Sequence, residues 1–290
     1  MKKILYSHTP SQGHWVGDGF PVRTVFSYND LARRISPFLL LDYAGPTEFA
    51  TSEHIRGVGP HPHRGFETVS IIYQGEVEHR DSAGGGGIIG PGDVQWMTAG
   101  SGLIHEEKHS AKYAKSGGPF EMVQLWVNLP AKHKMVAPRY QSLLDADFPR
   151  ATLPAGAGYL RVIAGQYLDH QGPAMTYSPI SLWDVVLKEG GSCQLQAPAQ
   201  QTLALFILSG EVEVCKEETF GACTLVILDP DDPEFTLHAS KSTKILVLSG
   251  QAFAEPIVGY GPFVMNTAEE IKQAISDYQS GKMGALRVES

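Results

Sequence analysis

Cysteine is scarce in this sequence, whose 290 residues contain only Cys193, Cys215 and Cys223. An odd, small number of cysteines does not build the disulfide framework of a secreted protein, so we expect reduced thiols and a cytoplasmic location. Basic residues are also few, because 23 lysines and arginines stand against 31 aspartates and glutamates, and the net charge is −8. Nucleic-acid-binding surfaces are usually basic, so we expect no direct nucleic-acid binding.

Long apolar runs are missing as well. A membrane-spanning helix needs roughly 20 consecutive apolar residues, and no such run occurs, so we expect no membrane span. The first eight residues include two lysines but no apolar core of the length that a signal peptide requires. The remaining composition, 42% hydrophobic and 19% charged, is typical of a globular protein.

Glycine and proline are plentiful, with 31 and 19 residues, and they separate short runs of β-branched and aromatic residues. Residues 68–73 and 76–80 read as two strands around a glycine turn, and residues 122–129 alternate cleanly between apolar and polar. This pattern predicts an all-β fold. A short helix is predicted over residues 267–279, because Thr267 and Glu270 form a capping-box pattern ahead of an apolar stripe.

The second half of the sequence repeats the first in outline. Residues 205–214 match the stretch around Gly75 at an offset of 135, and residues 228–232 echo residues 89–93 at an offset of 139. An internal duplication is therefore predicted, with domains at 1–145 and 146–290.

Two pairs of residues have the spacing of metal ligands on strands. His61 and His63 are two residues apart, and so are His105 and Glu107. Side chains two apart on a strand share one face, so facing strands would bring three imidazoles and one carboxylate together. That set is a coordination shell for a divalent transition metal. Glu67 has the same alternation as the first pair, so alternation alone leaves it open as the carboxylate ligand.

The second half does not keep these ligands. The two offsets place Gln196, Pro198, Lys244 and Leu246 at the four positions. We therefore expect no metal site in the second domain. His79 reads as a surface residue beside Arg80 and Asp81 in a hairpin, and His109 reads as a residue at the rim of the site.

Several stretches resemble the pirin family of the cupin superfamily. They are residues 37–42, 61–68, 91–100, 124–129 and 260–266. The resemblance implies a bicupin: two jelly-roll β-barrels facing each other, with the metal in the N-terminal barrel. It implies His61, His63, His105 and Glu107 as the ligands of one mononuclear metal. The implied metal is Fe(II), with Mn, Co, Ni, Cu and Zn as competitors.

The resemblance also implies two functions. The first is a quercetin 2,3-dioxygenase, which opens the heterocyclic ring of a flavonol with O₂ and releases CO, with Glu107 as a catalytic base. Phe66, Met97 and Trp126 would line its pocket. The second is an iron-binding redox sensor that binds a transcription factor or a metabolic enzyme. A shallow site without room for a bicyclic ligand would favour the second. We expect a monomer, since the second barrel would cover the first.

Overall fold

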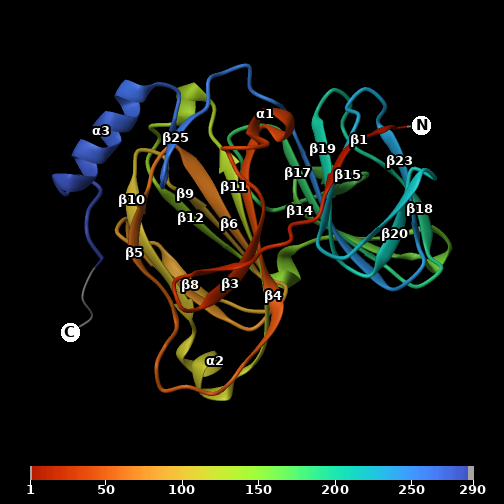
Figure 1. Ribbon diagram of the computed structural model, residues 1–290, viewed down its shortest axis with the longest axis horizontal. Helices are drawn as coiled ribbons and strands as arrows, with labels where there is room; N and C mark the ends of the chain where they lie inside the picture. The colour runs from red at the N-terminus through yellow and green to blue at the C-terminus, as the bar shows by residue number, and fades with distance from the viewer. Residues whose placement is uncertain (1, 287–290) are drawn as a thin grey trace. The chain divides into compact units, whose positions relative to one another are not determined.

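The computed structural model describes residues 2–286, which are drawn in Figure 1. Strands dominate these residues, so the all-β prediction is confirmed. The described helices are α1 (Ala32–Ile35), α2 (Ala111–Ser116) and α3 (Ala268–Gln279), with short 3₁₀ turns η1 (Ala131–His133), η2 (Asp145–Asp147) and η3 (Pro154–Gly156). Among residues 2–286, no helix has the length and apolar composition needed to span a lipid bilayer.

The chain forms two compact units. We call residues 12–32, 38–145 and 254–286 the histidine unit, and residues 2–11, 33–37 and 146–253 the apolar unit. These units differ from the predicted ranges 1–145 and 146–290 at both ends of the chain. The reason is that an N-terminal strand pairs within the apolar unit and the C-terminal helix packs on the histidine unit.

The histidine unit contains one sheet in the order β12-β9-β6-β11-β4-β3-β2 and a second in the order β5-β10-β7-β8. The first sheet consists of β2 (His14–Val16), β3 (Phe20–Phe26), β4 (Phe38–Phe49), β6 (Phe66–Gln74), β9 (Val94–Thr98), β11 (Gly118–Asn128) and β12 (Arg139–Leu143). The second consists of β5 (Gly57–His63), β7 (Val77–Asp81), β8 (Gly86–Ile89) and β10 (Leu103–His109).

Apolar side chains from both sheets meet in one interior. Val77 and Ile89 come from the four-stranded sheet, and they pack in one buried cluster with residues of the seven-stranded sheet and α2. The other members are Phe20, Val22, Ala44, Phe49, Ile72, Tyr113, Phe120 and Met122. Val16 of β2 and Val58 of β5 are partly buried and pack against this cluster.

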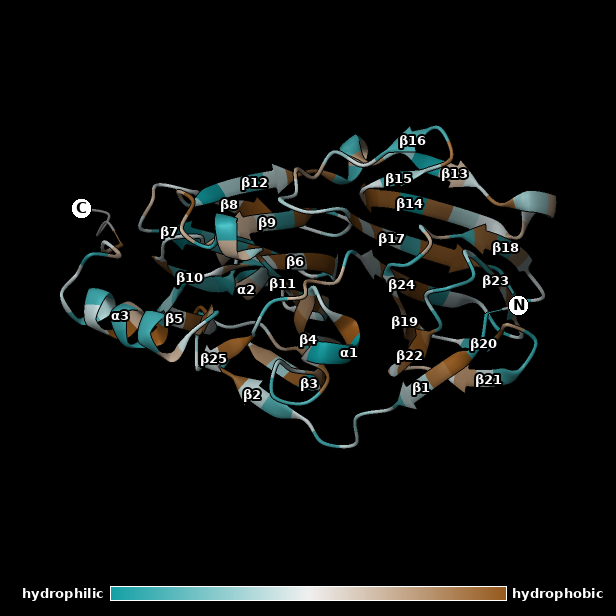
Figure 2. Cartoon of the chain, turned by 90° about the horizontal axis from the view of Figure 1, so that it is seen from above, coloured by the Kyte–Doolittle hydropathy of each residue, from teal (hydrophilic) through white to brown (hydrophobic). Residues whose placement is uncertain are grey.

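Helix α3 belongs to the histidine unit. Its N-terminus has the predicted capping box, because the Glu270 amide donates to the Thr267 hydroxyl and the Thr267 amide donates to the Glu270 carboxylate. Ile271 and Ala274 pack against β26 (Phe263–Met265), which pairs with β25 (Val258–Tyr260). Figures 1 and 2 both show α3 on the side of the unit that carries β5 and β10.

The apolar unit repeats this arrangement, which confirms the two-barrel prediction. Its sheets have the orders β1-β22-β19-β24-β17-β14-β13 and β18-β23-β20-β21, beside a small β15-β16 pair. The strands are β1 (Ile4–His8), β13 (Arg150–Thr152), β14 (Gly158–Ala164), β15 (Gln166–Tyr167), β16 (His170–Gln171), β17 (Ile180–Leu187), β18 (Ser192–Gln196), β19 (Thr202–Ser209), β20 (Glu211–Val214), β21 (Glu218–Gly221), β22 (Thr224–Leu228), β23 (Glu234–Ala239) and β24 (Thr243–Gly250). Hydrophobic residues run along β14 (Figure 2).

Strand β1 shows why the units differ from the predicted ranges. It pairs with β22, although some 220 residues separate the two strands, and so it takes the edge position that β12 has in the histidine unit.

The order of strands also corrects the offset of 139 that placed Lys244 and Leu246 at the positions of His105 and Glu107. The counterpart of β10 is β23, where Phe235 and Leu237 stand at the positions of His105 and Glu107. Both side chains are buried in the apolar core.

Candidate metal centre

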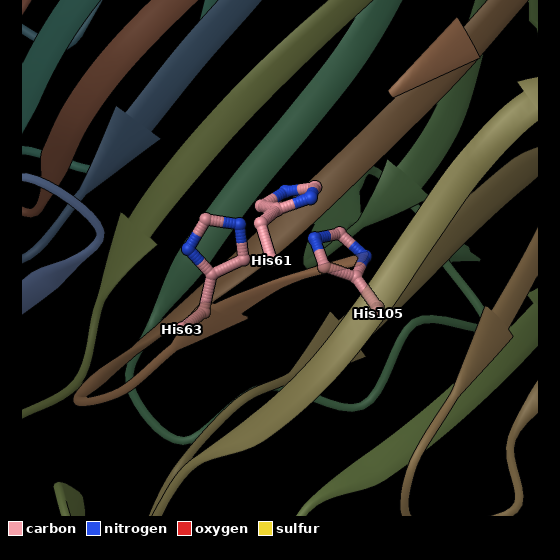
Figure 3. Close-up of side chains that lie close together, drawn as sticks. All are labelled: His61, His63 and His105. Carbon is pink, nitrogen blue, oxygen red and sulfur yellow. The ribbon is translucent and has the colours of Figure 1, made fainter. Parts of the chain in front are cut away.

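His61, His63 and His105 converge inside the histidine unit. In the antiparallel pair β5–β10, His105 lies directly opposite His61, and Leu103 lies opposite His63. The ring centroid of His105 lies 4.3 Å from that of His61 and 4.8 Å from that of His63. The centroids of the His61 and His63 rings are 4.9 Å apart. Figure 3 shows the three rings gathered around one point. One ring nitrogen from each lies within 4.8 Å of the other two, so the three can hold one metal ion.

Strand β5 is an edge strand, as its prolines predict. It ends the order β5-β10-β7-β8 and pairs only with β10. Pro60 and Pro62 have no amide hydrogen, and an edge strand tolerates this because one side of its backbone has no partner strand. The prolines are therefore compatible with the edge position of the strand that carries the two histidines.

Backbone carbonyl groups orient two of the rings. His61 Nδ1 lies 2.9 Å from the Gly59 carbonyl oxygen, and His63 Nδ1 lies 3.4 Å from that of Pro262. A carbonyl oxygen only accepts hydrogen bonds, so each Nδ1 is the protonated nitrogen. In a neutral ring, Nε2 then keeps its lone pair for a metal.

His79, predicted as a surface residue, is fully buried, and that prediction is wrong. It lies on β7 next to β10, and its Nδ1 is 3.3 Å from His105 Nδ1. On the other side of the ring, its Nε2 is 3.2 Å from an Asp81 carboxylate oxygen. The hairpin position suggested exposure, but β7 is an inner strand of its sheet. The two-residue spacing of His79 and Asp81 was the available signal.

The Glu107 and Asp81 carboxylates lie at the two ends of a chain of hydrogen bonds, and they fix the direction of its bonds. Glu107 only accepts, so the Gln95 atom 3.2 Å from it is the amide nitrogen, and the same nitrogen donates to His79 Nδ1 at 3.2 Å. His79 is therefore protonated on Nε2 and donates to Asp81. The single lone pair of His79 Nδ1 is shared by Gln95 Nε2 and His105 Nδ1, which lies 3.3 Å away. His105 Nε2 is left as a buried nitrogen with no hydrogen-bond partner among the described residues. A lone pair in that position fits a metal ion.

Burial keeps the cluster neutral. It holds the pKa of His63 well below the usual range, and the charge of a protonated His61 would lower it further. Burial does the same to the pKa of His105, with His63 as the next cause. Metal ligation requires neutral imidazole, so these two rings are in the required state at neutral pH without losing a proton first.

The Glu107 carboxylate lies beside the cluster and is held by two amide groups and one hydroxyl group. One oxygen accepts from Gln95 Nε2 at 3.2 Å, and the other accepts from Gln124 Nε2 at 3.2 Å. The Ser70 hydroxyl shares its one proton between Glu107 at 3.0 Å and Gln124 Oε1 at 2.6 Å. A Glu107 oxygen, a His79 nitrogen and a His105 nitrogen all lie within 4.8 Å of one another. His105 thus belongs both to this group and to the three-histidine group.

Glu67 does not lie beside the histidine cluster. Gly65, with φ of 90°, makes a turn between β5 and β6, so the alternation of His61 and His63 does not continue to Glu67. Its carboxylate accepts from Thr98 Oγ1 at 2.7 Å, whereas Ser70, on the other face of β6, contacts Glu107. Burial raises the pKa of Glu67 to about 7.

Two further residues near the motif have structural contacts. Glu106 points away from Glu107 and forms ion pairs with Arg80 and Lys108, as expected from alternation. His109 is buried, not at a rim, because its Nε2 bonds the Gly19 carbonyl oxygen at 2.9 Å.

A cavity of about 290 Å³ opens beside the cluster. Its polar lining comes from Asp42, His61, His63, Glu107 and Gln124, and its apolar lining from Val16, Phe20, Val22, Ala44, Val58, Met122, Trp126 and Pro262. Of the three predicted pocket residues, Trp126 lines it. Phe66 stacks behind Trp126 at 4.3 Å between centroids, and Met97 is buried in a separate apolar cluster.

The segment after His63 is anchored by two buried cations that sequence reasoning did not identify. Arg64 donates to the Ser101 carbonyl oxygen at 2.7 Å and to Asp277 of α3 at 2.9 Å. Lys134 Nζ lies 2.8 Å from the carbonyl oxygens of Gly65 and Val264. These bonds hold the C-terminal segment against the turn that follows the histidine pair.

Known proteins match the chain over nearly its whole length. Residues 19–127 match the family model described as Pirin, and residues 182–284 match the Pirin C-terminal cupin domain. A Pseudomonas aeruginosa protein named provisionally as a quercetin 2,3-dioxygenase is 58% identical over 97% of this chain and 98% of its own. A pirin-like protein of Solanum lycopersicum is 38% identical over 99% and 93%.

A solved structure agrees with this. The crystal structure of a quercetin 2,3-dioxygenase from Acinetobacter baumannii superposes with a TM-score of 0.96, at 52% sequence identity. The match covers 98% of this chain and 99% of that one. The predicted bicupin fold is therefore confirmed.

The hydrogen-bond chain predicts the tautomers of the metal-free protein. Nitrogen-15 NMR should find His61, His63 and His105 protonated at Nδ1 and His79 at Nε2. Asp81→Asn offers His79 an amide donor in place of a carboxylate, so the His79 tautomer should change, whereas the exposed Asp231→Asn should leave all four spectra unaltered. A proton on His105 Nε2 in the wild-type protein would contradict this chain.

The raised pKa of Glu67 predicts a pH-dependent stability. Between the ordinary value of 4.5 and about 7, the folded carboxyl group keeps a proton that the unfolded chain releases, so stability falls as the pH rises. Glu67→Gln removes this loss. At pH 8 its free energy of unfolding should exceed that of the wild type by up to about 3 kcal/mol, and the difference should vanish near pH 4.5.

Urea denaturation at the two pH values measures the effect. Glu217→Gln, at an exposed position, is the matched control and should show no such dependence. A difference between Glu67→Gln and the wild type that stays constant with pH would mean that the Glu67 proton is not the cause.

Proposed function

Because the chain belongs to the pirin family, we propose that it is a metal-dependent dioxygenase that opens the heterocyclic ring of a flavonol such as quercetin. The reaction takes up O₂ and releases CO and a depside. The similarity to the quercetin 2,3-dioxygenase of Acinetobacter baumannii, and to the Pseudomonas aeruginosa protein that carries this name provisionally, supports this substrate class. We place the protein in the cytoplasm as a monomer.

The observation that carries the proposal is the cavity beside the histidine cluster. His61, His63 and Glu107 line it together with apolar side chains. Its volume of about 290 Å³ is close to the lower end of the range for small-molecule sites, roughly 300–1,000 Å³. A cavity of this size supports a small-molecule substrate over a purely regulatory role.

The donor set fits a divalent transition metal. We propose His61, His63, His105 and Glu107 as ligands, with Fe(II) as the native metal and Mn, Co, Ni, Cu or Zn as competitors for the same nitrogen and oxygen donors. The unpartnered Nε2 of His105 is the structural support for this choice. When bound, the metal would supply Lewis-acid and one-electron redox chemistry.

Individual residues would have separate roles around the bound metal. Glu107 takes the proton of the substrate's enolic hydroxyl group, since a carboxylate within hydrogen-bond reach can act as a general base. The donors Ser70, Gln95 and Gln124 hold the Glu107 carboxylate in place. Trp126 forms an apolar wall that excludes water, and the stacked ring of Phe66 keeps it rigid.

One contact favours a regulatory role as the second candidate. Arg64 follows His63 directly, and its ion pair with Asp277 connects the histidine pair to α3 at 2.9 Å. In a redox-sensing protein, a change of metal charge beside His63 would be felt at the surface helix through this pair. A protein partner would then recognise α3.

Metal titration tests the ligand set. In anaerobic titrations with Fe(II) or Co(II), the wild-type protein should bind one equivalent, and His61→Ala and His105→Ala should each bind at least about 100-fold more weakly. Asp81→Asn, which acts through His79, should bind the metal about 10- to 100-fold more weakly than the wild type. His238→Ala removes an exposed histidine of the apolar unit and should bind normally. Wild-type affinity in His105→Ala would refute the site.

Turnover tests the reaction. Protein reconstituted with Fe(II) should consume quercetin, followed by the loss of flavonol absorbance, and release CO. Glu107→Gln should lower kcat by about 100-fold or more, because it removes the base. Iron binding without consumption of any flavonol would reject the dioxygenase and favour the regulatory candidate. A search for proteins that bind α3 would then test that candidate.

A further inference from the structure

A row of polar side chains crosses the large sheet of the histidine unit. In the strand register, Thr24 faces Asp42, Asp42 faces Gln124, Gln124 faces Ser70, and Ser70 faces Gln95. The five residues come from neighbouring strands, β3 to β9, and directly opposed residues of one sheet present their side chains to the same face. A polar row across the inside of a barrel is costly unless each group has a partner.

The row divides into two parts. Gln124 and Gln95 donate to Glu107, and the Ser70 hydroxyl lies within hydrogen-bond distance of both Glu107 and Gln124 Oε1. Asp42 takes no part in that network. Its Oδ1 accepts from Thr24 Oγ1 at 2.6 Å, and its Oδ2 accepts no hydrogen bond within residues 2–286.

Asp42 is therefore an incompletely bonded carboxyl group on the wall of a cavity. Its side chain is only 9% exposed, and it lines the cavity together with His61 and Glu107. Burial raises its pKa, whereas the Thr24 hydroxyl lowers it. The second oxygen is open to the cavity, so it can accept a hydrogen bond from a ligand that enters there.

We propose that Asp42, positioned by Thr24, binds a ring hydroxyl group of the substrate and so selects hydroxylated aromatic substrates. This assignment rests on the proposed function, since it names a second anchor in the same cavity. The substrate's enol lies at the Glu107 side, and a hydroxyl group on another ring reaches Asp42. The cavity wall beside Asp42 carries the apolar Val22, Ala44 and Met122 and the polar Gln124. The Gln124 amide already donates to Glu107 and faces Ser70, so the Asp42 carboxyl group is the anchor that remains for a ligand.

Binding to the metal-free protein tests this without turnover. The probes are quercetin and 3-hydroxyflavone, which keeps the 3-hydroxy-4-oxo group but has no other hydroxyl group. Fluorescence titration should show that Asp42→Leu weakens quercetin binding about tenfold or more, the usual effect of losing one buried hydrogen bond, and changes 3-hydroxyflavone binding less than about twofold.

Two further variants guard against misfolding. Asp42→Asn keeps the shape of the side chain, and Thr24→Val removes only the hydroxyl group that holds Asp42. Both should reduce the preference for quercetin over 3-hydroxyflavone. Glu67→Gln is the matched control, since Glu67 lies on the other face of the sheet, and it should keep the wild-type preference.

The outcomes separate the two proposals. Equal weakening of both probes in the Asp42 variants would overturn the inference, because it would indicate a structural role. So would an unchanged preference, or a wild-type protein that binds neither probe. A preference that depends on Asp42 supports the inference even if the iron-loaded protein fails to consume quercetin, and that failure would count against the dioxygenase alone.

Discussion

The direction of one buried hydrogen-bond chain determines what the histidine unit can do. Glu107 and Asp81 can only accept, so the groups between them, Gln95 and His79, have no choice of orientation. His105 Nδ1 shares the lone pair of His79 Nδ1 with Gln95, and His105 Nε2 is left without a hydrogen-bond partner among the described residues. A cluster of rings that could each take either tautomer would bind a metal less tightly, because part of the binding energy would go into selecting one state.

The apolar unit shows the same architecture without this chemistry. By strand order, the row Gln95–Ser70–Gln124–Asp42–Thr24 corresponds to Val226–Leu205–Val247–Trp183–Val162. Every member of the second row is buried in the apolar core. Exchange of polar for apolar side chains at fixed backbone positions therefore turns a cavity with two carboxyl groups into a packed interior. The loss of the ligands and the loss of the cavity are one change in side-chain polarity.

The sequence predicted the all-β fold, the duplication and the C-terminal helix, because these depend on local patterns. It also brought His61, His63 and His105 together, since strand alternation and a facing strand suffice for that. Alternation failed at Glu67, where the Gly65 turn interrupts the strand. It could not place His79, because whether a hairpin strand is inner or edge depends on pairing between distant segments.

The acceptor for His63 Nδ1 is the carbonyl group of Pro262, which lies 199 residues later in the chain. During synthesis on a ribosome, β5 and β10 emerge long before this acceptor exists. The nascent barrel can form its early strands, but the imidazole of His63 acquires its final orientation only after Pro262 has left the exit tunnel. Closing so long a loop is entropically costly and slow. The His63 ring therefore gains this bond only after the segment around Pro262 has been synthesised.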